Sequence, residues 1–212
     1  MKKRLVVMAS GSGSDMQSIM DAIDRGEIDG EIVLVIVSKH GAYAAERAKQ
    51  HGIKTVEICL RDYPGKSEFF DANLAAIDEA RPDGIILAGY LSILDRRITE
   101  KYANRIINIH PALIPSFCGD GFYGKRVHQA VIDYGAKISG ATIHFVDEHA
   151  DHGPIIMQET VPVYFEDTAD TLAARVLELE HKILPKAVGL FCADRLHVIG
   201  RAVKIDEQEE RK

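Results

Sequence analysis

Hydrophobic positions in the chain follow two alternating patterns. Continuous apolar runs at residues 5–9 and 85–89 are typical of strands buried on both faces of a parallel sheet. The stretch after the first run instead repeats apolar residues every three or four positions, at Met16, Ile19 and Ile23, which predicts an amphipathic helix. This alternation of strand and helix is typical of an α/β fold with a parallel sheet.

The same two patterns extend over most of the chain. They predict further strands at residues 31–37, 54–59 and 106–110, and further helices at residues 43–51, 66–81, from about 95, and at 127–134. Residues 139–146 and 155–164 are expected to form an antiparallel strand pair, and residues 168–196 one or two helices, broken near Pro185. We therefore expect a Rossmann-like, open, mostly parallel twisted sheet with helices on both faces and an antiparallel strand pair toward the C-terminus.

Length, charge and cysteine content narrow the class of protein. The chain of 212 residues fits one α/β domain, expected over residues 1–203, followed by a charged tail at residues 204–212. The net charge of -6 argues against a nucleic-acid surface, and no apolar run approaches the roughly 20 residues of a membrane helix. Cys59, Cys118 and Cys192 are far apart and odd in number, which suits a reducing compartment. We expect a cytoplasmic monomer or homodimer that acts on small molecules.

The end of the strand at residues 106–110 carries the first candidate chemistry. Side chains alternate along a strand, so Asn108 and His110 point the same way, and Pro111 ends the strand. The carboxyl end of a parallel strand is where ligands bind in open sheets. An amide can hold an oxygen that gains charge, and an imidazole can move a proton. Taken alone, the pair also fits an asparagine turn and a buried histidine with a structural hydrogen bond.

A glycine-rich turn follows the first strand. Residues 10–15 read Ser-Gly-Ser-Gly-Ser-Asp and lead into the first helix, the geometry that presents free N–H groups to a phosphate. A dinucleotide fingerprint would need a third glycine where Met16 stands, and the Gly-Lys-Ser/Thr of a P-loop is absent. The pattern therefore favours one small phosphate. A plain turn with Ser14 as helix cap fits the local sequence equally well.

Two further motifs point to a known family. Asn-Ile-His-Pro-Ala-Leu-Ile-Pro-Ser-Phe at residues 108–117 resembles the signature of the folate-dependent formyltransferases and formyl-folate hydrolases, and Asp-His-Gly-Pro at residues 151–154 resembles their later Asp before Gly-Pro. The resemblance runs from about residue 5 to residue 191. It implies 10-formyltetrahydrofolate as cosubstrate, and no metal. The phosphate loop and the short chain favour the branch that formylates the amine of glycinamide ribonucleotide in purine synthesis.

The resemblance also implies roles for individual residues. The catalytic set would be Asn108, His110 and Asp151, with Asp151 orienting His110 and raising its pKa. The ribonucleotide phosphate and amine would be bound by Gly11, Ser12, Gly13, Ser14, Asp15 and Glu180. The folate would lie against Leu91, Ser92, Ile93, Leu94 and Asn108. Asp15 and Ser92 depart from the family, which commonly has Asn and in some members Arg at these places. Three glycines and two aromatic residues at 118–126 predict a mobile flap over the site.

Three alternatives remain open on the sequence. A formyltetrahydrofolate hydrolase would share the signature, although it usually carries an extra N-terminal regulatory domain. A metal-dependent hydrolase could take its ligands from His110, His128, His144, His149, Asp151 and His152. A non-catalytic nucleotide-binding module would keep the phosphate loop and would not need Asn108, His110 and Asp151 to converge.

Overall fold

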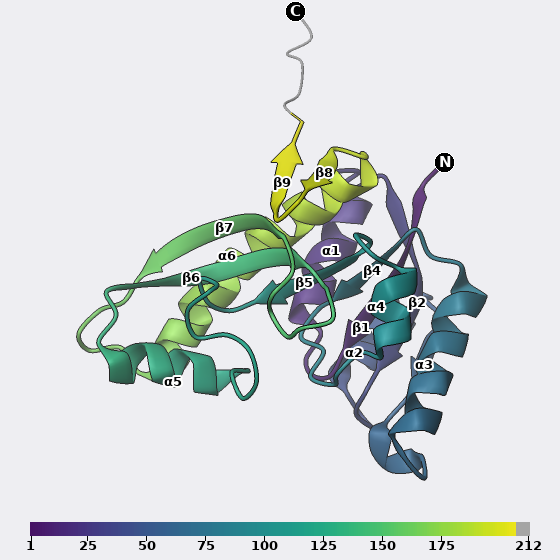
Figure 1. Cartoon of the computed structure of the whole chain (residues 1–212), viewed down its shortest axis with the longest axis horizontal. Helices are drawn as coiled ribbons and strands as arrows, with labels where there is room; N and C mark the ends of the chain where they lie inside the picture. Colours follow the sequence, from purple (N-terminus) through teal and green to yellow (C-terminus); the bar gives the residue numbers. More distant parts are fainter. Residues whose placement is uncertain (207–212) are drawn as a thin grey trace, which may run out of the picture.

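The computed structural model describes residues 1–206, which form a nine-stranded sheet with helices on both faces (Figure 1). The strands are β1 (Lys3–Ala9), β2 (Gly30–Val37), β3 (Thr55–Glu57), β4 (Gly84–Leu87), β5 (Ile106–His110), β6 (Ile138–Phe145), β7 (Ile155–Pro162), β8 (Leu196–Ile199) and β9 (Ala202–Ile205). The helices are α1 (Ser14–Asp24), α2 (Tyr43–Gln50), α3 (Lys66–Ala80), α4 (Arg96–Lys101), α5 (Lys125–Tyr134) and α6 (Ala169–Cys192), with a 3-10 turn η1 at Leu60–Asp62.

The first five strands of the sheet are parallel, and the other four are mixed, since β7 and β9 pair in parallel. The strand order is β3-β2-β1-β4-β5-β6-β7-β9-β8, and β3, β2, β1, β4 and β5 all run parallel. β6 and β7 add antiparallel to this half, which confirms the predicted antiparallel pair. The third predicted strand lies at the edge of the sheet and is shorter than expected.

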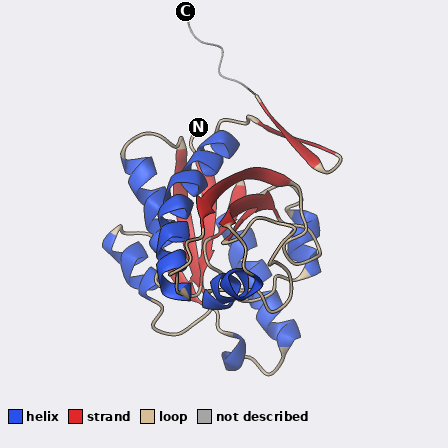
Figure 2. Cartoon of the chain, turned by 90° about the vertical axis from the view of Figure 1, so that its left-hand side faces the viewer, coloured by secondary structure: helices blue, strands red, loops and turns tan. Residues whose placement is uncertain are grey.

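Two hydrophobic layers cover the sheet, and β1 contributes to both. Its residues Leu5 and Val7 pack with α1, α2 and α6, whereas Val6 and Met8 pack with α3 and α4. A strand that is buried on both faces needs apolar residues at every position, and this is the origin of the continuous run at residues 5–9. Figure 2 shows the helices on the two sides of the sheet.

Two expectations for the C-terminal region are wrong. Helix α6 is one unbroken helix although it contains Pro185, because Ile183, Leu184 and Ala187 are buried against the sheet and their packing outweighs the lost backbone hydrogen bond. It ends at Cys192, and residue 196 already belongs to the β8–β9 hairpin, which continues the sheet beyond β7.

The expected boundary between domain and tail also shifts. Residues 204 and 205 belong to β9, and the peptide N–H of Asp206 donates to the carbonyl of Arg195 at 3.0 Å. The remainder of the expected tail, residues 207–212, lies outside the described residues.

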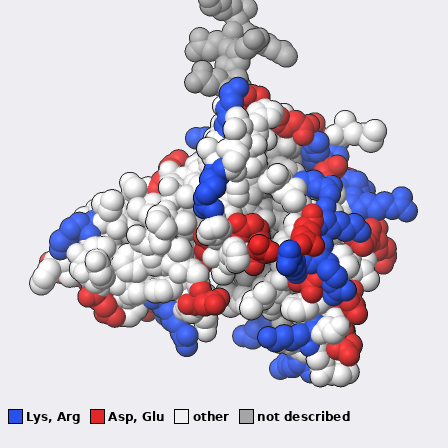
Figure 3. All heavy atoms as spheres, viewed as in Figure 1, with Lys and Arg blue, Asp and Glu red and all other residues white. Residues whose placement is uncertain are grey.

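Three surface and chemical properties of the structure were also expected from the composition. Within residues 1–206, no helix combines the length and the apolar character needed to cross a membrane. On the face seen in Figure 3, basic and acidic side chains are interspersed. The three cysteines are all free thiols.

Candidate active site

Three chain segments meet where parallel strands end. Met8 of β1 pairs with Leu87 of β4, and Leu87 pairs with Asn108 of β5, so the loops after these strands open at the same edge of the sheet. The hydroxyl of Ser10 accepts a hydrogen bond from the peptide N–H of Leu91 at 2.8 Å. The predicted phosphate loop is therefore fastened to the predicted folate-binding segment, and both lie beside Asn108.

Asn108 is held by a histidine on the neighbouring strand. The two residues face each other in the β5–β6 ladder, and Nδ2 of Asn108 lies 3.0 Å from Nε2 of His144. The other ring nitrogen of His144, Nδ1, donates to the carbonyl of Phe145 at 2.8 Å, which leaves Nε2 to accept from the Asn108 amide. This contact fixes the orientation of the amide. The role of His144 was missed from the sequence because it depends on the register between β5 and β6.

His110, the last residue of β5, is buried with 4% of its surface exposed. Its Nε2 lies 2.9 Å from the carbonyl oxygen of Phe117, to which it donates. A carbonyl only accepts, so Nε2 carries a hydrogen and Nδ1 is the nitrogen free to take up a proton. Nδ1 lies 3.4 Å from Oδ2 of Asp151. A proton that reaches Nδ1 is therefore stabilised by a carboxylate at once.

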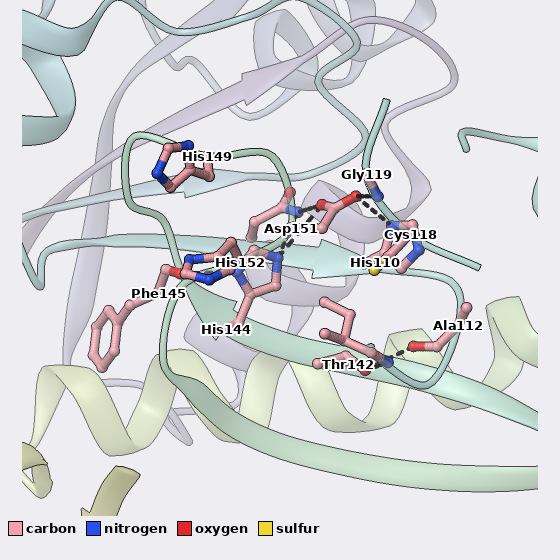
Figure 4. A network of polar contacts seen from close by, with 12 residues as sticks. His110, Ala112, Cys118, Gly119, Thr142, His144, Phe145, His149, Asp151 and His152 are labelled. Carbon is pink, nitrogen blue, oxygen red and sulfur yellow. Dashed lines mark hydrogen bonds and ion pairs between the residues drawn. The ribbon is translucent and has the colours of Figure 1, made fainter. Parts of the chain in front are cut away.

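Asp151 reaches both residues from the loop between β6 and β7 (Figure 4). Its Oδ2 accepts from the peptide N–H of Gly119 at 2.9 Å, and its Oδ1 lies 3.5 Å from Nδ2 of Asn108. The structure thus brings together Asn108, His110 and Asp151, although Asn108 and Asp151 are 43 positions apart in the sequence. The peptide of Gly119 was not foreseen as a partner, since a backbone donor leaves no trace in the sequence.

Burial and neighbouring charges set the protonation of this site. Burial raises the pKa of Asp151, but contacts with His144, His110 and the Gly119 N–H outweigh it and hold the pKa below its ordinary value. Burial lowers the pKa of His110, and the Asp151 carboxylate offsets this only in part. Asp151 thus acts on the pKa of His110 in the expected direction, but burial, which the sequence did not reveal, leaves that pKa below its ordinary value. At neutral pH the pair consists of an anion and a neutral ring.

The glycine-rich turn forms an open helix N-terminus. Gly13 is the N-cap residue of α1, with φ of 71°, and no side chain caps the helix. Ser14 is the first residue of the helix, so the alternative interpretation, a plain turn with Ser14 as the helix cap, is wrong. A Cβ added to Gly13 would lie 2.8 Å from both Cα and Cβ of Ala44, so the turn rests directly on α2. Gly11 and Ser12 are exposed at its tip. Free N–H groups at such an end favour a phosphate.

Two carboxyl groups lie beside the start of α1. Glu180 on α6 is only 7% exposed, and burial together with the charge of Asp15 raises its pKa well above the ordinary value. Burial also raises the pKa of Asp15, while His181 opposes the rise from 3.6 Å. Glu180 is therefore not a solvated helix charge. It is held in a costly buried place next to the predicted phosphate loop, which is typical of a functional group.

The predicted folate segment presents apolar side chains to solvent. Leu91 and Ile93 are 62% and 73% exposed, whereas Ser92 and Leu94 are half-buried. Tyr90 anchors the segment from below, with its ring buried and its hydroxyl 3.4 Å from Oδ1 of Asn73. An exposed pair of aliphatic side chains at the edge of a polar site is suited to cover a flat ring.

The glycine-rich stretch after β5 lies against His110 and Asp151. Gly119, Gly121 and Gly124 all have positive φ values, so the stretch turns sharply several times. The carbonyl of Phe117 and the N–H of Gly119 bind His110 and Asp151, respectively. The start of the predicted flap therefore holds the side chains of His110 and Asp151 in place.

The ligand set of the metal-hydrolase alternative is not assembled. His149 points away from the Asp151 carboxylate (Figure 4). His152 pairs with Asp147 at 2.9 Å. Within residues 1–206, the His, Cys, Asp and Glu side chains close enough to share an ion are those of His40, Glu57 and Cys59, at the ends of β2 and β3. None of these three belongs to the proposed set.

Comparison with known proteins gives a consistent result. Residues 3–188 match the family model described as formyl transferase. The chain is 39% identical over 92% of its length to "Phosphoribosylglycinamide formyltransferase, chloroplastic" of Vigna unguiculata, and the match spans 62% of that relative. It is 34% identical to "Phosphoribosylglycinamide formyltransferase" of Escherichia coli (strain K12), over 96% of this chain and 94% of that one.

A solved structure agrees with the sequence relatives. The crystal structure of glycinamide ribonucleotide transformylase 1 from Symbiobacterium toebii superposes with a TM-score of 0.91 at 36% identity, over 97% of this chain and 95% of that one. The resemblance inferred from residues 108–117 and 151–154 is confirmed, because the family model covers both motifs and most of the chain. The chain belongs to the formyl transferase family.

Proposed function

We propose that the protein is a phosphoribosylglycinamide formyltransferase, which transfers the formyl group of 10-formyltetrahydrofolate to the amine of glycinamide ribonucleotide. The observation that carries the proposal is the convergence of Asn108, His110 and Asp151 within 3.5 Å contacts at the sheet edge that also carries the phosphate loop. The curated relatives described above carry this activity in their names, and the chain spans nearly the whole length of the E. coli protein.

Asn108 is proposed to hold the formyl oxygen. As the amine attacks the formyl carbon, negative charge develops on that oxygen, and a preorganised donor stabilises it without rearranging. The amide of Asn108 is fixed by His144 and cannot titrate, so its N–H groups are available at every pH. Its contact with Asp151 is long, at 3.5 Å, and is easily exchanged for a stronger acceptor.

His110 and Asp151 are proposed to handle the proton. The attacking amine must lose a proton as it forms the new C–N bond, and the departing folate nitrogen must gain one. Nδ1 of His110 is free to accept the proton, and Asp151 at 3.4 Å stabilises the resulting cation. The same proton can then pass to the leaving nitrogen, so the pair ends the reaction as it began.

The two substrates are proposed to bind on either side of these residues. Gly11, Ser12, Gly13 and Ser14 offer backbone N–H groups to the phosphate of the ribonucleotide, and Glu180 lies close by as a hydrogen-bonding partner for its sugar or amine end. Leu91 and Ile93 offer the exposed apolar surface on which the folate ring would lie. This chemistry needs no metal ion. Free thiols at all three cysteines agree with a location in the reducing cytosol.

A steady-state assay tests the proposal. Release of tetrahydrofolate from 10-formyltetrahydrofolate should be fast only when glycinamide ribonucleotide is present, and it should survive a chelator. Release that is equally fast without the ribonucleotide would identify a formyltetrahydrofolate hydrolase instead. Activity that a chelator abolishes and zinc restores would favour the metal-dependent hydrolase.

A further inference from the structure

The loop that carries Asp151 is contacted by the C-terminal hairpin. β8 and β9 join through a two-residue turn, because Ile199 pairs with Ala202 and only Gly200 and Arg201 lie between them. Gly200 has φ of 61°, the conformation that a turn of this kind demands at its first position. The second residue of the turn, Arg201, is thereby placed on the loop between β6 and β7.

Arg201 makes its contacts at the residue after Asp151. Its Nη2 donates to the carbonyl of His152 at 2.8 Å, and its Nη1 lies 3.2 Å from Nε2 of the same ring. His152 in turn pairs through Nδ1 with Asp147 at 2.9 Å. A chain of polar contacts therefore runs from the hairpin through His152 to the beginning of the loop.

The hairpin is itself fixed at this place. Ile155 of β7 pairs with Ala202 of β9, and these residues directly follow the loop and Arg201 in the sequence. The loop is also packed from within, since a Cβ on Gly153 would lie 1.8 Å from the carbonyl oxygen of Phe145. Between these two anchors the peptide after Asp151 has few ways to move.

Asp151 depends on such restraint. Its φ is 52°, a left-handed conformation that is unfavourable for residues other than glycine and persists only where the surroundings enforce it. The carboxylate is restrained by the N–H of Gly119, and the backbone one residue further on is restrained at the carbonyl of His152, which accepts from Arg201. Loss of this second hold would let the side chain drift from His110 and Asn108.

We propose that Arg201 is a positioning residue for formyl transfer, which fixes the His152 peptide and so keeps the Asp151 carboxylate in place against His110 and Asn108. The inference rests on the function proposed above, because it assigns Arg201 to that reaction. Arg201 does not touch the reacting groups, and nothing in the sequence motif around Asp151 points to it.

Kinetics of Arg201 variants provide the first test. Arg201→Ala should lower kcat by about tenfold, the order expected when a catalytic group is displaced by a fraction of an ångström, and leave KM for both substrates unchanged. Arg201→Lys keeps one donor for the His152 carbonyl and should recover part of the loss. Lys204→Ala is the matched control: it removes a cation from the same hairpin, where Lys204 pairs with Asp206 at 3.4 Å, and should behave as the wild type.

Hydrogen exchange provides a test that does not depend on activity. The peptide N–H of His149 donates to Oδ1 of Asp147 at 2.9 Å, and Asp147 is held by His152, which contacts Arg201. Loss of Arg201 should loosen this chain of contacts. The amides of residues 147–154 should therefore exchange faster in Arg201→Ala than in the wild type or in Lys204→Ala. Faster exchange with a lower kcat and an unchanged melting temperature supports the inference. Unchanged exchange, or faster exchange with wild-type kcat, overturns it. If the wild type shows no transfer, the proposed function fails, and exchange still reports whether Arg201 holds the loop.

Discussion

Replacement of Asp151 by Asn tests the charge at the centre of the site. The substitution preserves the shape of the side chain but removes its charge and one of its two acceptor oxygens. The carboxylate accepts from the Gly119 N–H at 2.9 Å and from Nδ2 of Asn108 at 3.5 Å, and it lies 3.4 Å from Nδ1 of His110, where a proton arrives during the reaction. An amide has one acceptor oxygen for these two donors and carries no charge to stabilise a protonated His110.

The size of the effect follows from the distance between the charges. Opposite unit charges 3.4 Å apart attract by about 5 kcal/mol at an effective dielectric constant of about 20. That attraction arises when His110 takes up the proton, so it stabilises the transition state and not the resting enzyme. If rearrangement recovers half of the loss, kcat falls by about 10²-fold, and if it recovers none, by nearly 10⁴-fold. Binding of a folate analogue should be nearly unchanged.

Two measurements decide the outcome. Single-turnover kinetics give the rate of the chemical step, and nuclear magnetic resonance of the labelled histidine ring gives the pKa of His110. Burial already lowers this pKa and Asp151 opposes the effect, so the pKa should fall further in Asp151→Asn. Asp133→Asn, on the exposed face of α5, is the matched control. A rate within threefold of the wild type, or an unchanged His110 pKa, would refute the reasoning.

Three further substitutions examine other parts of the site. Asn108→Ala should lower kcat by about 10²–10³-fold through loss of the oxyanion donor; a loss below tenfold would show that the amide is only structural. Gly13→Ala forces a side chain into a φ of 71° and to 2.8 Å from Ala44, so KM for the ribonucleotide should rise about tenfold or more while folate binding stays intact; equal weakening of both ligands would contradict the phosphate assignment. Burial, with the charge of Asp15, raises the folded pKa of Glu180 above 4.5, so its contribution to stability is fully present below about pH 4.5 and is lost as the pH rises through the folded pKa. Glu180→Gln should therefore melt at a higher temperature than the wild type at pH 8 but not at pH 4.5, with a raised KM for the ribonucleotide; equal differences at both pH values would be inconsistent with a buried carboxylate.

Much of the parallel half of the fold follows from local sequence. A continuous apolar run predicts a strand buried on both faces, and residues 5–9 lie in β1 for this reason. Pro111 ends β5 as expected, because it cannot donate to the ladder. The alternation of side chains along that strand also predicted that Asn108 and His110 face one side, and both indeed contact Asp151.

Other features depend on tertiary structure and could not be predicted locally. Pro185 is a strong helix-breaking signal, but burial of its neighbours keeps α6 continuous. The strands β8 and β9 have four residues each, too few for a clear periodic pattern. His144 and Arg201 act through strand register and a distant hairpin, respectively, and the lowered pKa of His110 follows from burial that a motif does not reveal.

The fate of the formyl carbon tests the central claim most directly. The purified protein is mixed with 10-formyltetrahydrofolate labelled with ¹³C in the formyl group and with glycinamide ribonucleotide, and the label is followed by nuclear magnetic resonance. The account predicts that the label appears in the formamide of the ribonucleotide at the rate at which tetrahydrofolate is released, with no free formate. Label that accumulates as formate, with or without the ribonucleotide, would contradict it.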